Sequence, residues 1–127
     1  MAKFKDGVMF SGMRITNGKP RKVEGVSDEI HMAIAMWDAL MSVEIGDQGT
    51  VTSLADGTHS KKSKHYGTYR LNKGKMGWWC DAVDLRTRYL SKNQQMDCAQ
   101  KMRNGLGKDF DVVLENTHLH IEYDPKK

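Results

Sequence analysis

Three side chains of the kind that bind zinc stand out in this sequence: His65, Asp84 and His120. Two imidazoles and one carboxylate are a common ligand set for a catalytic zinc, because they leave a fourth position for water. A structural zinc is more often enclosed by four Cys or His ligands, and the chain has only two Cys. Because a bound zinc activates water for attack on an amide, these residue types favour a zinc-dependent hydrolytic site.

Such a site also needs a base, and Glu115 and His118 are the candidates because they precede His120 on the same segment. In a strand, His118 and His120 point to the same face, since they are two residues apart. Glu115 can reach that face only if the chain turns at Asn116 and Thr117. A polar outer face of an edge strand would produce the same alternation, so the pattern alone leaves both interpretations open.

The elements that must position these residues are two helices and several short strands. A helix is predicted over residues 27–44, with Ser27 as its N-cap, and another over residues 91–104, where Ser91 and Gln94 form a capping box. The residues expected to face the core are Ile30, Ala33, Ile34, Trp37, Leu40 and Met41 in the first helix, and Met96, Ala99 and Met102 in the second. Strands are expected at residues 50–54, around Asp84, and at 110–115 and 118–123. This order predicts an α+β fold, a small antiparallel sheet flanked by helices.

Composition limits the other possibilities. The 127 residues suit a single domain, 1–127, and no apolar run is long enough for a transmembrane helix, so we expect a monomer without membrane insertion. No signal peptide is visible after Met1, which predicts synthesis in the cytoplasm. Cys80 and Cys98 are expected to be free thiols. The net charge of +4 only weakly favours an anionic partner such as cell wall or nucleic acid.

At these residues the chain resembles the zinc D-alanyl-D-alanine peptidases and their relatives. This group includes D-Ala-D-Ala carboxypeptidases and dipeptidases, phage L-alanyl-D-glutamate endopeptidases and the hedgehog signalling domain. Its motifs are S-x-H-x-x-G-x-A-x-D and a later H-x-H or E-x-x-H. Residues 63–65 match the beginning of the first motif, residues 82–84 match its end, and residues 118–120 match the second. The resemblance covers residues 50–125, and the segments beside the motifs look like those of phage-encoded members.

The resemblance implies a hedgehog/DD-peptidase-like fold in which His65, Asp84 and His120 bind zinc. It also implies that His118 stabilises the transition state or moves a proton, and that Ser63 supports a ligand or touches substrate. The implied activity is hydrolysis of amide bonds in peptidoglycan stem peptides by a phage carboxypeptidase or endopeptidase. Such an enzyme would be made in the host cytoplasm and would reach the wall through a holin or as part of a virion.

The chain departs from the first motif, because eighteen residues, 66–83, separate His65 from Asp84. Residues 66–79 are predicted to form an inserted β-hairpin that turns at Asn72, Lys73 and Gly74. Its aromatic and basic side chains are candidates to bind sugar rings, peptide or acidic groups of a substrate: Trp78, Trp79, Tyr69, Arg70, Lys73 and Lys75. The tryptophans would equally serve to pack the hairpin onto the domain. The insertion makes His59 an alternative ligand to His65.

Two other functions remain as alternatives. The first is a non-catalytic binding module in which zinc supports the structure, and the lack of an obvious base favours it. The second is a small basic nucleic-acid binder, which rests only on charge and on the hairpin that contains Trp78. Because nucleic-acid binding does not account for His118 and His120, we expect no nucleic-acid partner.

Overall fold

The computed structural model describes residues 2–8, 12–16, 19–54 and 67–125. This part of the chain contains two helices, α1 (Asp28–Ile45) and α2 (Lys92–Leu106). Five of its strands form one sheet: β1 (Lys3–Phe4), β4 (Thr50–Ser53), β7 (Ala82–Arg86), β8 (Phe110–Leu114) and β9 (His118–Tyr123). Four others form a second sheet: β2 (Gly12–Thr16), β3 (Lys19–Val26), β5 (Thr68–Asn72) and β6 (Lys75–Cys80).

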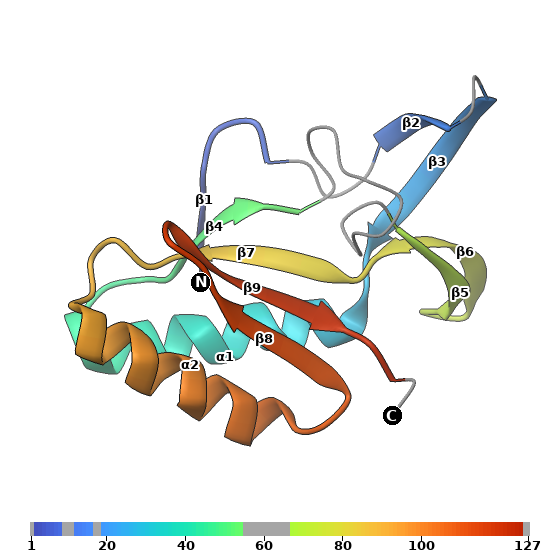
Figure 1. Ribbon diagram of the computed structural model, residues 1–127. Coiled ribbons are helices and arrows are strands. Elements are labelled where there is room, and N and C mark those ends of the chain that lie inside the picture. The colour runs from blue at the N-terminus through green and yellow to red at the C-terminus, as the bar shows by residue number, and fades with distance from the viewer. Residues whose placement is uncertain (1, 9–11, 17–18, 55–66, 126–127) are drawn as a thin grey trace.

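The α+β class is confirmed, but the prediction of one antiparallel sheet is wrong. The larger sheet has the order β1-β4-β7-β9-β8 and the smaller one β2-β3-β6-β5 (Figure 1). Both are mixed, because β1 runs parallel to β4 and β3 runs parallel to β6. Parallel partners need a long connection between them, so their pairing leaves no local signal in the sequence.

Both predicted helices are present, and their ends follow the predicted caps. The Ser27 hydroxyl accepts a hydrogen bond from the Ile30 amide, and Gly46 ends α1 in the left-handed conformation, with φ of 66°. Ser91 and Gln94 form the expected capping box at the start of α2. The prediction for Met96 is wrong, since 64% of it is exposed. Its neighbour Gln95 is buried instead, and its side-chain amide donates to the backbone carbonyls of Thr87 and Leu90 in the preceding loop.

The core lies between the helices and one face of the five-stranded sheet (Figure 1). Alternate residues of three neighbouring strands point into it: Val83 and Leu85 of β7, Leu119 and Ile121 of β9, and Phe110 and Val112 of β8. The residues between them must therefore point to the opposite face, because side chains alternate along a strand. This face carries the candidate chemistry, and it is called the open face because neither helix packs against it.

The predicted hairpin is confirmed as β5 and β6, which join at the predicted turn. Asn72 pairs with Lys75, and both Lys73 and Gly74 have positive φ, as a type I′ turn requires. A single residue, Asp81, separates β6 from β7. The hairpin is thus joined directly to the strand that carries Asp84.

A network of ion pairs connects this hairpin to α1. The Arg70 guanidinium donates to both carboxylate oxygens of Asp81, at 2.8 and 2.7 Å, and to Glu29 of α1 at 2.7 Å. Hydrogen bonds and the charges of the two carboxylates raise the pKa of Arg70, although burial opposes the shift. Only 1% of the Asp81 side chain is exposed, so its charge depends on Arg70 for compensation.

Replacing Arg70 with Ala is expected to destabilise the fold by roughly 3 kcal/mol, because it leaves the buried carboxylate of Asp81 unpaired. The free energy of unfolding in urea, measured by circular dichroism, tests this expectation. The matched control is Lys75→Ala, which breaks the exposed pair with Glu24 and should cost less than about 1 kcal/mol. Equal effects of the two substitutions would show that the network does not hold the hairpin.

Candidate metal centre

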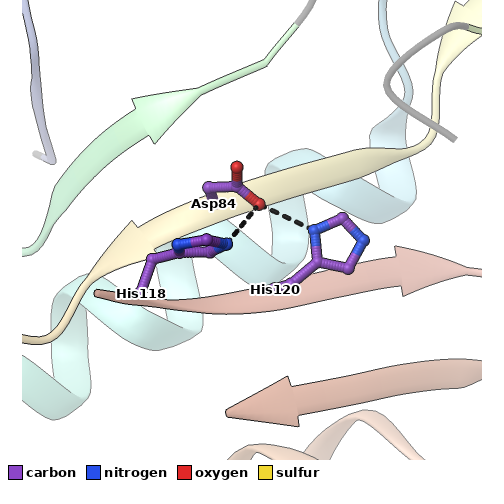
Figure 2. A group of neighbouring side chains, drawn as sticks. All are labelled: Asp84, His118 and His120. Atoms are coloured by element: carbon purple, nitrogen blue, oxygen red, sulfur yellow. Dashed lines mark hydrogen bonds and ion pairs between the residues drawn. The ribbon is translucent and has the colours of Figure 1, made fainter. Parts of the chain in front are cut away.

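The candidate site lies where β7 and β9 pair on the open face of the sheet. The antiparallel register places Asp84 directly opposite His120 and Arg86 directly opposite His118. Side chains on one face of directly opposed positions lie within contact distance, and long side chains also reach their diagonal neighbours. The pairing therefore brings a carboxylate and two imidazoles together (Figure 2).

Three side chains converge closely enough to share a metal ion. Asp84 Oδ1 lies 2.7 Å from His120 Nδ1 and 3.6 Å from His118 Nε2, and the three ligand atoms are all within 4.8 Å of one another. Ligands at about 2.0–2.1 Å from a tetrahedral zinc are about 3.3 Å apart. Two nitrogens and one oxygen at these separations fit zinc after small shifts of the side chains.

His120 is held between two carboxylates. Its Nδ1 contacts Asp84, and its Nε2 lies 2.9 Å from Glu122 Oε1. Burial alone lowers the pKa of His120, but the hydrogen bonds and charges of Asp84 and Glu122 outweigh burial and raise the pKa to about 9. The two carboxylates therefore favour the protonated form of His120, and a metal that binds this imidazole must compete with a proton.

The raised pKa of His120 predicts how the stability of the zinc-free protein depends on pH. Protonated His120 stabilises the folded state through its two carboxylate partners. This stabilisation is fully present below the ordinary pKa of 6.5 and is lost as the pH rises through the folded-state pKa of about 9. We expect a loss on the order of 2 kcal/mol in the free energy of unfolding between pH 6 and pH 9.5. His120→Gln should lack this component, so urea unfolding of both proteins with a chelator present tests it. Parallel pH profiles would contradict the prediction.

A second contact pairs Glu115 with His118. The chain turns after β8, and the Glu115 amide donates to the His118 carbonyl at 2.9 Å. This turn brings Glu115 Oε2 to 3.0 Å from His118 Nε2, while Thr117 Oγ1 lies 3.0 Å from His118 Nδ1. The chain therefore turns at Asn116 and Thr117, which is the condition for Glu115 to reach the face of His120.

The other predicted site residues fall in different places. Ser63, His65 and the alternative ligand His59 lie outside the residues that the structure describes. Trp78 is partly exposed and makes an edge contact with Tyr69, with ring centroids 5.4 Å apart. Its availability for a substrate remains a prediction.

Two predicted substrate contacts are engaged within the protein itself. Trp79 is only 5% exposed, because neighbouring residues of a strand point to opposite faces and Trp79 faces inward. Its indole N–H donates to the Lys75 carbonyl. Arg70 faces acidic groups as expected, but they are Asp81 and Glu29 of this protein. Both residues therefore hold the hairpin in place.

The structure adds features to which the sequence gave no role. Glu122 contacts His120, and its position two residues later on the same strand is the signal that places it on the same face. Two hollows flank the three candidate ligands. One has a volume of about 670 Å³ and borders His120 and Glu122, and the other has a volume of about 420 Å³ and borders Asp84 and His118.

The remaining findings concern the whole chain. Cys80 and Cys98 are buried free thiols, as predicted. In the described residues, no helix is both long and apolar enough to cross a membrane.

Comparisons of the chain with family models, with curated proteins and with solved structures found no match.

Proposed function

We propose that this protein is a zinc-dependent peptidase that hydrolyses amide bonds in peptidoglycan stem peptides, as a phage-encoded carboxypeptidase or endopeptidase. The observation that carries the proposal is the convergence of Asp84, His118 and His120 on one open face, with Glu115 in contact with His118. A carboxylate, two imidazoles and an adjacent second carboxylate are the groups that metal-assisted hydrolysis requires.

Asp84 and His120 belong to both ligand sets that the chain offers. The sequence adds His65 as the third ligand, whereas the geometry of the described residues adds His118. When bound, zinc would polarise the amide carbonyl and activate water. Glu122 contacts the second ring nitrogen of His120 and fixes the orientation of the ring, which is the usual task of a carboxylate behind a histidine ligand.

The proton transfers of hydrolysis fall to Glu115 and His118. Glu115 is exposed, so it can accept a proton from water and return one to the leaving amine. Its contact with His118 holds the carboxylate beside the metal ligands, at 3.0 Å from the imidazole nitrogen. The lack of an obvious base favoured a non-catalytic module, and this contact supplies a candidate base.

The experiment that tests the proposal is mass spectrometry of purified peptidoglycan after incubation with zinc-loaded protein, with a chelator-treated sample as the control. New metal-dependent fragments are the expected result, and their masses identify the bond that is cut. If a folded, zinc-bound protein produced no fragments, the non-catalytic zinc module would replace the peptidase.

A further inference from the structure

The hollow beside Asp84 and His118 is strongly basic. Its lining includes the side chains of Lys5, Arg86 and Arg88 together with hydroxyl and amide groups of Thr52, Ser53 and Asn116, and these six residues are named the basic pocket. The acidic residue that lines it is Asp84, whose charge a bound zinc would neutralise. With zinc in place, the charges of the described lining therefore favour an anion.

The two arginines of the basic pocket are held by a neutral group. Arg86 donates to the Tyr89 hydroxyl at 3.1 Å, and the Arg88 guanidinium lies 5.4 Å from the centroid of the same ring. Hydrogen bonds from Arg86 and then from Arg88 lower the pKa of Tyr89. Tyr89 thus contacts both arginines of the basic pocket.

These cations have no anionic partner among the described residues. No carboxylate oxygen in that part of the chain lies within 4.0 Å of a side-chain nitrogen of Arg86, Arg88 or Lys5. Arg70, by contrast, is engaged by two carboxylates. Like charges that are held together without a counter-charge repel each other, and a bound anion relieves that repulsion.

We propose that the basic pocket binds a carboxylate of the peptide substrate, immediately beside the amide bond that is hydrolysed. This inference rests on the proposed peptidase function. The guanidinium group matches a carboxylate through two parallel hydrogen bonds, and Asn116 lines the same hollow with a side-chain amide. Because Asp84 and His118 also border the pocket, a carboxylate bound there lies next to the metal ligands.

The test uses two synthetic stem peptides that differ only at the C-terminus, which is a free acid in one and an amide in the other. Arg86→Gln and Arg88→Gln should each reduce kcat/KM for the free acid by roughly 10- to 100-fold, the usual range for a charged hydrogen bond, and should leave the amide unchanged. Lys108→Gln, which removes a cation from the other hollow, is the matched control and should affect both peptides little.

A third peptide separates the two sources of a carboxylate. It is amidated at its C-terminus and carries a glutamate side chain beside the scissile bond. If only this peptide loses activity in the arginine variants, the pocket binds a side-chain carboxylate, and the inference stands with that source. Equal losses on all three peptides, or no loss on any, would overturn it.

A binding measurement keeps this inference separate from the proposed function. N-acetyl-D-alanine, added to zinc-loaded protein, should shift the NMR signals of the Arg86 and Arg88 side-chain N–H groups, whereas N-acetyl-D-alaninamide should not. Such shifts without any peptidase activity would support the pocket and reject the peptidase. Peptidase activity that depends on neither arginine, with no such NMR shifts, would support the peptidase and reject the pocket. Stronger binding of a short single-stranded DNA than of either probe, lost in the arginine variants, would assign the pocket to nucleic acid.

Discussion

Asp84→Asn is expected to remove zinc from the protein and to reduce hydrolysis by at least about 10³-fold, because a metal supplies several kcal/mol of transition-state stabilisation. Asp84 is shared by both possible ligand sets and contacts His120 directly. The amide keeps the size of the carboxylate but cannot provide the same anionic ligand. Zinc content by elemental mass spectrometry and the rate of peptidoglycan cleavage measure the two effects.

The control for this substitution is Asp97→Asn on α2, where the exposed carboxylate pairs with exposed Lys101. It should retain zinc and activity, since surface ion pairs contribute little to stability. An active, zinc-loaded Asp84→Asn variant would remove Asp84 from the metal centre. The circular dichroism spectrum of the Asp84→Asn variant must match that of the wild type. A match shows that any loss of zinc does not result from unfolding.

Glu115→Gln is expected to lower kcat by roughly 10²- to 10⁴-fold while zinc content remains unchanged, because the amide cannot accept the proton that general-base catalysis transfers. The geometry behind this expectation is the 3.0 Å contact between Glu115 and His118. Glu44→Gln on α1 is the matched control and should retain full activity. Unchanged kcat in the Glu115 variant would show that another group is the base.

His118→Gln then separates the two roles that His118 can have. If His118 transfers a proton and His65 is the third ligand, the variant keeps zinc and loses activity, whereas His65→Ala loses zinc. If His118 is the third ligand, His118→Gln loses zinc and His65→Ala keeps it. Zinc content of the two variants therefore decides which histidine completes the ligand set.

Local chemistry made much of the fold predictable. Ser27 and Ser91 mark the starts of both helices because their hydroxyls satisfy free amides, and residues 72–74 mark a hairpin because two positions need positive φ. Strand alternation likewise placed His118 and His120 on one face. These features depend on neighbours in the sequence, so they can be recognised without the structure.

Features that depend on distant pairing could not be predicted in this way. The position of Asp84 opposite His120 is a property of strand register, which no local pattern indicates. Residue types and the resemblance predicted only that both side chains bind the same metal. Arg70 looked like a substrate contact because its partners, Asp81 and Glu29, come from other elements. The side-chain contact of Glu115 with His118 likewise depended on the conformation of the turn between β8 and β9.

The most direct test of the metal centre is X-ray absorption spectroscopy at the zinc edge, on protein reconstituted with one equivalent of zinc. We predict a first shell of nitrogen and oxygen at about 2.0–2.1 Å that includes histidine. Asp84→Asn should lose this signal. A sulfur shell at about 2.3 Å would place the metal at a cysteine instead. That result, or a folded wild-type protein that retains no zinc, would contradict the proposed centre at Asp84 and His120.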